Sequence, residues 1–507
     1  MTTGESTEQR IEVRNPASGQ VVGEVDVQTS DHVSAAVRTL RQRQPSWERL
    51  GPRGRATWLR RLRDWLLDNE SDLLDRIQSE TGKPRQEALL EVTLACDAIN
   101  YFSDHAAEFL ADERIRPHGL LTIPKSRLRV YRPHPVVGVI SPWNFPLLIP
   151  AVDAIPALLA GAAVVVKPSE VTPFSALELA RGWREIGAPA VFAVVTGDGA
   201  TGAAVVDAVD MVQFTGSTAT GRKIAARAGE RLIPCSVELG GKDPAIVLAD
   251  ADLERAANGI VWGALANSGQ ICISVERVYV EAPVYQRFLE LLTERVRAVR
   301  QGAGTPGAEI EVGAMATAAQ TEIVRAHVDA AVAAGATVVC GGTAAPDGAF
   351  FEPTVLTGVD HSMVCMREET FGPTIPVMRV ADEREAVRLA NDSEYGLSAT
   401  VWTGDRARGL RVARQLEVGA VNINDAYTNL FAFGLPHGGW KTSGLGTRLG
   451  GAQGIRKYCR QQAITAPRIP ALRSEITWYP YSILRSRAVS AVLHLVVGRD
   501  LRRRLHG

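Results

Sequence analysis

The chain has 507 residues, of which 46% are hydrophobic and 22% charged; this is ordinary for a globular protein and too long for one core. Lysine plus arginine and aspartate plus glutamate both number 56, so a formal net charge of zero gives no general attraction to nucleic acid. Six scattered cysteines without CxxC spacing argue against a disulfide framework or a metal site, and predict a reducing, cytoplasmic location.

Neither the N-terminus nor the apolar runs predict a signal peptide or a membrane span. Residues 1–10 are polar and lack the apolar centre of a secretory signal. The longest apolar run, Ala154–Val166, is shorter than the roughly 20 residues that a bilayer requires. We expect this run to be a helix that leads into a buried strand.

From Val136 onward, short β-branched runs alternate with alanine-rich helical segments. This alternation predicts βαβ units and a parallel sheet. It restarts after Gly241, so the sequence predicts an α/β fold with two Rossmann-like lobes. The expected strands are 136–141, 162–166, 191–195, 211–215, 245–248 and 274–280, and the expected helices are 151–159, 176–185, 202–209, 253–266, 285–300 and one from Ser217.

The last 40 residues, 468–507, form a separate basic tail. Trp478-Tyr479-Pro480-Tyr481 precedes a helix-like stretch, Ile483 to Leu505, in which six arginines lie among leucine and valine. One interpretation is a basic amphipathic helix on a membrane surface. The other is a helix packed on a neighbouring subunit, with its arginines in solvent.

Two patterned stretches carry groups suited to nucleophilic chemistry. Cys272 follows Gly269-Gln270, a turn typical of a loop that opens onto a site. A free thiol has a pKa of about 8.5, so the site has to supply donors or positive potential to form the thiolate. Glu238, in Glu238-Leu239-Gly240-Gly241-Lys242, is a carboxylate that can activate water as a base.

Two further stretches complete the pattern. Asn144, in Pro142-Trp143-Asn144-Phe145-Pro146, follows a predicted strand, where the ligand clefts of parallel sheets lie. Its amide can donate to an oxyanion together with the backbone N–H of Cys272, and each such donor contributes roughly 3 kcal/mol. The fourth stretch is Glu369-Thr370-Phe371-Gly372-Pro373.

In this order, the four stretches resemble the NAD(P)-dependent aldehyde dehydrogenase superfamily, from about Asn15 to about Thr465. The resemblance implies that an aldehyde is oxidised to a carboxylic acid through a Cys272 thiohemiacetal and thioester. Asn144 would hold the oxyanion, and Glu238 would activate the water that hydrolyses the thioester. The resemblance also implies an NAD-binding domain (1–113 and 134–240), a catalytic domain (241–439), and a hairpin (114–133) and arm (455–467) that form a homodimer or homotetramer.

The resemblance assigns the cofactor site as well. Lys167 and Glu170 would bind the adenosine ribose, and the Glu170 carboxylate favours NAD because it repels a 2′-phosphate; NADP is the alternative. Gly216 and Ser217 open a helix whose N–H groups suit a pyrophosphate. Glu369 and Phe371 would hold the nicotinamide ribose and ring. The remaining predicted cofactor residues are Ile140, Ser141, Trp143, Ser169, Gly199 and Leu239.

A rival phosphate loop exists at Gly197–Gly202, which matches G-x-G-x-x-G after a predicted strand. No acidic residue lies near position 222, where the ribose partner of such a loop is expected. We therefore place this loop beside the adenosine end of the cofactor and not around its phosphates.

The sequence departs from the resembled family at Asp153 and Arg448. Many members carry a lysine nine positions after the oxyanion asparagine and a glutamate in the late Ser-Gly segment. Both charges are reversed here. We hypothesise that Asp153 and Arg448 meet as an inverted ion pair beside Glu238; the alternative is that they never touch.

The substrate is the least constrained prediction. The loop 425–433 would line the substrate tunnel with Tyr427, Phe431 and Phe433, which favours an apolar or aromatic aldehyde. The run Cys-Ile-Ser-Val-Glu-Arg from Cys272 and the reversed charges resemble actinobacterial succinate-semialdehyde dehydrogenase-like members, although the loop has no lysine or arginine. A membrane-surface fatty aldehyde dehydrogenase is a further alternative. A non-catalytic scaffold is disfavoured by the intact Cys272, Glu238 and Asn144.

Overall fold

The computed structural model describes residues 9–118, 122–303, 309–468, 470, 473–475 and 477–505. Its contacts divide the chain into two compact units, one of residues 1–109 with 133–459 and one of residues 110–132 with 460–507. The predicted boundaries at 113, 240 and 439 stay predictions, because contacts join both predicted lobes into the first unit.

A six-stranded sheet forms the centre of the first predicted lobe. Its order is β19-β9-β8-β5-β6-β7, and all neighbours except β19 and β9 are parallel. Every residue of β5, β6 and β8 is buried, as the continuous β-branched runs predict for a parallel sheet covered on both faces. The strands are β5 (Val136–Ile140), β6 (Ala163–Lys167), β7 (Phe192–Val194), β8 (Met211–Thr215), β9 (Cys235–Glu238) and β19 (Gly444–Leu445).

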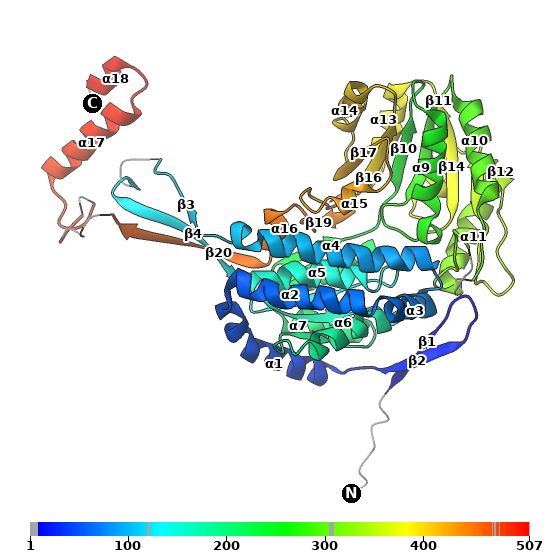
Figure 1. Ribbon diagram of the computed structural model, residues 1–507. Coiled ribbons are helices and arrows are strands. Elements are labelled where there is room, and N and C mark those ends of the chain that lie inside the picture. Colours follow the sequence, from blue (N-terminus) through cyan, green and yellow to red (C-terminus); the bar gives the residue numbers. More distant parts are fainter. Residues whose placement is uncertain are drawn as a thin grey trace, which may run out of the picture. The chain divides into compact units, whose positions relative to one another are not determined.

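Helices pack on this sheet, and α2, α4 and α5 run alongside one another (Figure 1). The apolar run Ala154–Val166 is the end of α5 followed by β6, as predicted, with Gly161 in a left-handed conformation (φ 104°) at the turn. The helices are α1 (Ser30–Arg49), α2 (Gly51–Asp68), α3 (Glu70–Thr81), α4 (Arg85–Phe109), α5 (Leu148–Ala160), α6 (Phe174–Glu185), α7 (Gly199–Ala208) and α8 (Thr218–Glu230); β1 (Arg10–Arg14) and β2 (Val21–Asp26) form a hairpin.

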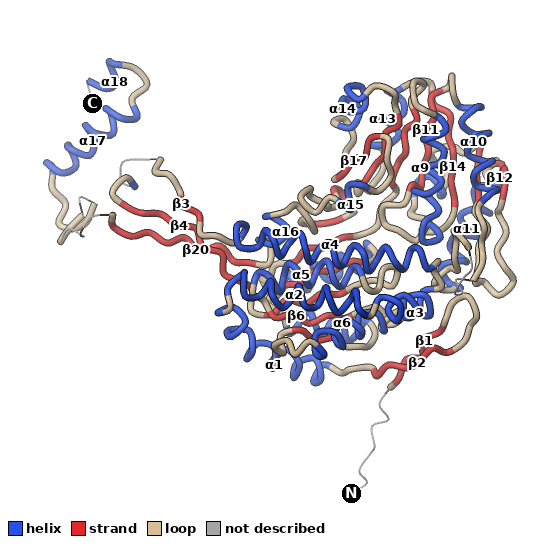
Figure 2. Tube along the Cα trace, viewed as in Figure 1, coloured by secondary structure: helices blue, strands red, loops and turns tan. Residues whose placement is uncertain are grey.

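The second sheet has seven strands in the order β12-β13-β14-β11-β10-β16-β17 (Figure 2). Side chains alternate across it: Ala245 and Val247 pack with helices α9 and α10, whereas Ile246 and Leu248 pack with α11, α13 and α14. Its strands are β10 (Asp243–Val247), β11 (Val275–Glu281), β12 (Thr337–Cys340), β13 (Thr354–Thr357), β14 (Thr374–Val380), β16 (Ser398–Trp402) and β17 (Ala420–Ile423). The helices are α9 (Leu253–Leu265), α10 (Tyr285–Ala298), α11 (Ala318–Ala333), α12 (Val364–Arg367), α13 (Glu383–Asn391), α14 (Arg406–Ala413), α15 (Thr428–Phe431) and α16 (Ala452–Arg456), and a small sheet pairs β15 (Tyr395–Gly396) with β18 (Trp440–Lys441).

The predicted fold class is therefore confirmed, and element ends differ where caps decide them. Helix α7 begins at Gly199 and not at the predicted Gly202, because the Asp198 carboxylate accepts hydrogen bonds from the backbone N–H groups of Ala200 and Thr201. Predicted helix 285–300 ends at Ala298.

The second unit contains a three-stranded sheet in the order β20-β4-β3 and two helices. Strand β20 begins at Cys459, inside the predicted arm 455–467, and Ile455 at the start of that range lies in α16 and is fully buried. The predicted tail helix 483–505 is two helices separated at Gly498. The elements are β3 (Glu113–Arg114), β4 (Lys125–Pro133), β20 (Cys459–Pro467), α17 (Ile483–Val497) and α18 (Leu501–Leu505).

Across the described part of the chain, no helix is both long and apolar enough to cross a membrane.

Candidate active site

The loop that carries Cys272 is built around three consecutive left-handed residues. Asn267, Ser268 and Gly269 have φ angles of 51°, 58° and 71°. Such backbone is unfavourable for side-chain-bearing residues and persists only where surrounding contacts enforce it. A Cβ on Gly269 would come within 2.2 Å of the Gly372 carbonyl oxygen, so only glycine fits where the two loops cross.

Hydrogen bonds from this loop reach the Asn144 loop. The Asn267 Nδ2 donates to the Asn144 carbonyl oxygen at 3.1 Å and to the Gln270 carbonyl oxygen at 3.1 Å. The Asn144 Nδ2 donates to the same Gln270 oxygen at 2.8 Å. The structure thus brings Asn144 and Cys272 together through the backbone between Asn267 and Cys272.

A buried ion pair that the sequence did not reveal supports Asn144 from the other side. Lys83 Nζ lies 2.7 Å from Glu91 Oε1 and donates to the Asn144 carbonyl oxygen at 2.8 Å. The other oxygen of Glu91 accepts from the N–H groups of Leu147 and Leu148. One sequence signal was present: Glu91 lies on the apolar stripe of α4, where a charge needs a partner.

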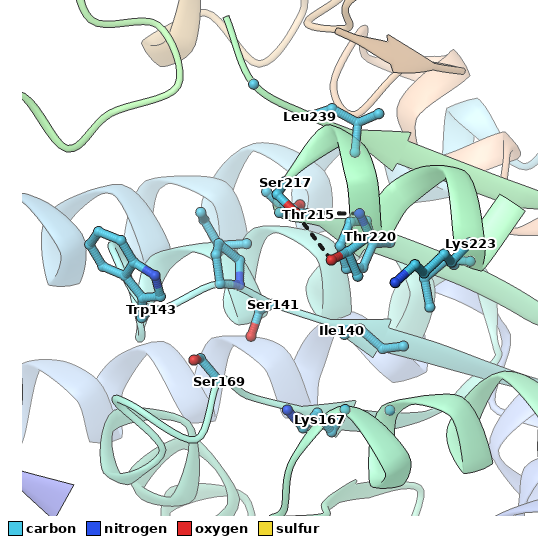
Figure 3. Close-up of a pocket in the computed structure, with 18 of the residues that line it drawn as sticks. Ile140, Ser141, Trp143, Lys167, Ser169, Thr215, Ser217, Thr220, Lys223 and Leu239 are labelled. Atoms are coloured by element: carbon cyan, nitrogen blue, oxygen red, sulfur yellow. Dashed lines mark hydrogen bonds between the residues drawn. The ribbon is translucent and has the colours of Figure 1, made fainter. Parts of the chain in front are cut away.

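A cavity of about 1010 Å³ opens at the carboxyl ends of β5, β6 and β8. All twelve predicted cofactor residues line it, together with Asn144 and Cys272: Ile140, Ser141, Trp143, Lys167, Ser169, Glu170, Gly199, Gly216, Ser217, Leu239, Glu369 and Phe371. Figure 3 shows part of this lining, including Ser141, Ser169 and Ser217. The buried Ser141 hydroxyl has no partner among the described residues, which leaves it available to a ligand.

Helices α7 and α8, whose first turns line this cavity, differ in what occupies their N-terminal N–H groups. At α7, the negative Asp198 carboxylate takes the Ala200 and Thr201 N–H groups. At α8, the neutral Ser217 hydroxyl accepts only from the Thr220 N–H, at 3.3 Å. A carboxylate at the helix start repels a phosphate, so α8 is the better phosphate site and the G-x-G-x-x-G loop the poorer one.

The Glu369–Phe371 segment rests on a second buried ion pair. Lys242 Nζ lies 2.6 Å from Glu276 Oε2, and the Glu276 carboxylate accepts from the backbone N–H groups of Thr370 and Phe371 at 2.7 and 2.8 Å. Phe371 has a positive φ of 52°, which these bonds enforce. Glu369 itself accepts from the Gly241 N–H at 2.9 Å.

Glu238 ends β9 and is almost fully buried. Neither of its carboxylate oxygens has a well-aligned hydrogen-bond partner among the described residues. Burial raises its pKa to about 7, and the positive charges of Arg448 and Lys457 oppose this shift. The negative charge of Asp153 adds to the shift, whereas the nearby Gly439 N–H opposes it. A carboxylate with this pKa is half-ionised near neutral pH and suits a general base.

The hypothesised pair of Asp153 and Arg448 is confirmed. The Arg448 Nε and Nη2 atoms lie 3.0 and 3.1 Å from the two carboxylate oxygens of Asp153, with both side chains buried. Arg448 also donates to the Thr215 hydroxyl. The bidentate geometry compensates both charges beside Glu238.

A small apolar pocket meets the cofactor-sized cavity at Cys272. Apart from the thiol, its polar members are Arg448, which Asp153 already binds, and His437, which burial keeps neutral by lowering its pKa to about 3. The full lining also includes Leu94, Phe145, Leu148, Ile149, Val152, Ile271, Cys272, Ile273, Leu430, Phe433 and Leu449.

The three predicted tunnel residues lie in different places. Phe433 lines the apolar pocket. Tyr427 is buried and donates its hydroxyl to the Gly263 carbonyl oxygen at 2.6 Å, whereas Phe431 packs, partly buried, against the adjoining core. Besides Leu430 and Phe433 of the predicted loop, α4, α5 and the residues around Cys272 line the pocket. The loop-based prediction missed these residues because their approach depends on long-range packing.

Burial raises the pKa of the Cys272 thiol to about 12, and only Arg448 opposes this shift among the named neighbours. The thiol alone is therefore protonated at neutral pH, and it needs a bound group with positive charge or a base to react. The Cys272 thiol thus lies between an apolar pocket and a cavity large enough for a dinucleotide, and the buried Glu238 carboxylate is nearby.

The chain belongs to the aldehyde dehydrogenase family, whose model matches residues 2–464. It is 42% identical over 459 residues to a putative succinate-semialdehyde dehydrogenase [NADP(+)] of Mycolicibacterium smegmatis, covering 89% of this chain and 88% of that protein. It is 39% identical over 498 residues to the 4,4'-diapolycopene aldehyde oxidase of a Methylomonas species, covering 96% of this chain and 91% of that protein. A Mycobacterium tuberculosis aldehyde dehydrogenase solved with NAD+ has a TM-score of 0.87 and 33% identity, covering 92% of this chain and 96% of that one. The protein is thus an oxidoreductase, and its reaction is the NAD(P)-dependent oxidation of an aldehyde.

The Asp153–Arg448 pair predicts strong coupling between the two positions. Asp153→Lys or Arg448→Glu alone should lower the free energy of unfolding by about 3–5 kcal/mol, because each leaves two like charges buried together. The double variant restores opposite charges, and it should recover more than half of either loss in guanidinium denaturation. A double variant that loses the sum of the two single effects would contradict the pairing.

Proposed function

We propose that Cys272 is the nucleophile, Asn144 the oxyanion donor and Glu238 the general base of this aldehyde oxidation. The observation that carries the proposal is the position of Cys272, which lines both the cofactor-sized cavity and the apolar pocket. A substrate carbonyl in the pocket and a nicotinamide in the cavity can therefore reach the same sulfur.

The residues divide the reaction into two steps. The Cys272 sulfur adds to the aldehyde carbon, while the Cys272 N–H and the Asn144 amide donate to the developing oxyanion. The oxyanion then re-forms the C=O bond as a hydride leaves the same carbon, which a bound nicotinamide would accept, and a thioester remains on Cys272. Glu238 then takes a proton from water, the water oxygen adds to the thioester carbon, and the carbon–sulfur bond breaks to release the carboxylic acid.

The cavity lining supports the predicted division of the cofactor. Gly216 and Ser217 open α8 for the pyrophosphate, and Glu369 and Phe371 take the nicotinamide end. Lys167 Nζ lies 3.0 Å from Glu170, whose partly exposed carboxylate is placed for ribose hydroxyls. Lys223 also lines the cavity and offers a positive charge, so NADP is accommodated while NAD is preferred.

An apolar aldehyde is the substrate class that the pocket supports best. Its lining is hydrocarbon apart from the thiol, a neutral histidine and an arginine whose charge Asp153 compensates. The relative named for an aldehyde of 4,4'-diapolycopene is consistent with this class. That match covers 96% of the chain and so leaves out only about 20 residues, which means that it extends into the 40-residue tail.

Succinate semialdehyde is the competing substrate. The relative that is 42% identical carries this name, and Arg448 is the one cation among the described residues that line the pocket. A free carboxylate in the pocket would have to compete with Asp153 for that cation.

The second unit supports assembly and contact with an anionic membrane surface. Strand β20 is an edge strand whose residues from Arg460 to Pro467 are all exposed, a pairing edge for the proposed homodimer or homotetramer.

Helix α17 is exposed almost throughout, with Leu484 81% and Val497 68% accessible. Exposed Trp478, Tyr479 and Tyr481 precede it, and residues 477–505 hold six arginines against one acidic residue. Its 15 residues span about 22 Å, which is too short to cross a bilayer, so any membrane contact through α17 would be at the surface.

The apolar pocket predicts substrate preference. With NAD, long alkanals or aryl aldehydes should give a kcat/KM at least about tenfold above that for succinate semialdehyde, since a free carboxylate lacks a partner there. NADH formation, followed at 340 nm, measures kcat/KM for both classes of aldehyde. Cys272→Ala should abolish turnover, while Cys340→Ala, a cysteine outside both cavities, should leave it unchanged. Turnover of succinate semialdehyde alone would contradict the assignment.

The Glu170 carboxylate predicts the cofactor preference. Glu170→Gln removes the charge that repels a 2′-phosphate, and the NADP-to-NAD ratio of kcat/KM should rise about tenfold. The exposed Glu290→Gln on α10 is the control and should not change the ratio. An unchanged ratio in Glu170→Gln would remove this residue from cofactor discrimination.

The tail predicts binding to anionic lipid. The full chain should co-sediment with phosphatidylserine vesicles, more weakly at high salt, and a chain ending at Pro470 should remain in the supernatant. Leu493→Glu with Val496→Glu should also lose binding while it keeps the whole tail. Equal sedimentation of all three proteins would remove the tail from membrane binding. A shift only in oligomer size would indicate that the tail packs on a neighbouring subunit.

A further inference from the structure

The sheet places four polar side chains on one face beside Glu238. In the parallel register, Thr215 lies opposite Glu238 and Gln213 opposite Ser236. Side chains two residues apart share a face of a strand, so Gln213, Thr215, Ser236 and Glu238 face the same side. This polar patch is unusual inside a parallel sheet whose other positions are mostly apolar.

Several atoms of this patch lack partners in the described part of the protein. They are the Ser236 hydroxyl, the Gln213 Nε2, both carboxylate oxygens of Glu238 and the nearby Tyr458 hydroxyl. Buried polar groups of this kind are normally satisfied by water. The patch therefore has the composition of a hydrated polar layer and not of a sealed core.

Two cations approach this layer from the segment after β19. Arg448 is bound to both oxygens of Asp153 and to Thr215. Lys457, which is partly buried, donates from Nζ to Gln213 Oε1 at 2.7 Å and lies 4.9 Å from the centre of the Tyr458 ring. No carboxylate of the described residues forms an ion pair with Lys457.

Among the described charged groups around Glu238, only one cation lacks a carboxylate partner of its own. The titratable or charged groups that face it are Arg448, Lys457, Asp153, Cys272, His437 and Tyr458. At neutral pH, His437, Cys272 and Tyr458 are uncharged, and Asp153 is already compensated by Arg448. Among these groups, Lys457 is the one remaining cation to match the Glu238 carboxylate.

We infer that Lys457 is the counter-ion of Glu238 and acts as a positioning residue that keeps the water-activating carboxylate ionised. Gln213, whose Oε1 accepts from Lys457, shares a face of the sheet with Glu238, so the two charges lie on the same polar layer without direct contact. This inference rests on the proposed role of Glu238 as the base.

The pKa directions agree with this arrangement. Burial raises the pKa of Glu238 to about 7 and lowers that of Lys457 to about 8, and each group's charge opposes the shift of the other. Loss of the Lys457 charge therefore leaves burial and Asp153 to raise the pKa of Glu238 further. Less of the base is then ionised at neutral pH.

Infrared titration of the full-length protein tests this without any aldehyde. The C=O stretch of protonated Glu238, assigned by its absence in Glu238→Gln, is followed against pH in wild type, Lys457→Met, Lys457→Gln and Lys457→Arg. The midpoint should rise by at least about one pH unit in both neutral variants and stay near the wild-type value in Lys457→Arg. Lys441→Met, a lysine near Glu417 at the surface, is the control and should not shift it.

An unmoved midpoint in either folded neutral variant would overturn the inference, as would an equal shift in Lys457→Arg. This titration needs no turnover, so its result can be interpreted even if the wild-type protein oxidises no aldehyde. Such a lack of activity would refute the proposed function but not the pairing of Lys457 with Glu238. With an active wild type, stopped flow at pH 6 should show an NADH burst in Lys457→Met followed by a steady rate about tenfold lower, since thioester hydrolysis becomes limiting. Lys457→Arg should restore the rate.

Discussion

One constraint organises this site: a charge buried beside the reacting groups has to be compensated where it stands. Three buried ion pairs satisfy it, and each supports a different functional segment. Lys83 and Glu91 hold the Asn144 loop, and Lys242 and Glu276 hold the backbone at Phe371. Arg448 and Asp153 lie beside Glu238. The proposed catalytic groups Asn144, Glu238 and Cys272 form no ion pair among the described residues.

Burial acts to different extents on the two central groups. It raises the pKa of Cys272 to about 12, which makes the thiol unreactive until a ligand supplies positive charge. It raises the pKa of Glu238 only to about 7, because Arg448 and Lys457 oppose the shift. The same apolar surroundings thus keep the thiol protonated in the absence of a ligand and raise the pKa of the Glu238 carboxylate to near neutral pH.

Much of this could be predicted from sequence because it is local. Strand β6 (Ala163–Lys167) is a short run rich in valine, and the four stretches around Asn144, Glu238, Cys272 and Glu369 are each contiguous in the chain. The residue types and spacing of a contiguous stretch can be read before the fold is known, even where distant contacts fix its final backbone.

Contacts between distant segments were harder to predict. The Asp153–Arg448 pair spans 295 positions, yet it was predictable because two charges were reversed together. The Lys83–Glu91 ion pair beneath the Asn144 loop and the part of the pocket lined by α4 could not be predicted, since both depend on how a distant helix packs. Tyr427 shows the reverse error, because an aromatic residue of the expected tunnel loop is buried in the core instead.

The central claim is that the acyl group passes through Cys272 and that Glu238 releases it. Its most direct test is intact and peptide mass spectrometry of Glu238→Gln after mixing with an oxidisable aldehyde and NAD. The account predicts one acyl group per chain, held as a thioester on the Cys272 peptide and removed by hydroxylamine, with one NADH formed per chain. Full turnover by Glu238→Gln, or an acyl group on any other cysteine, would contradict it.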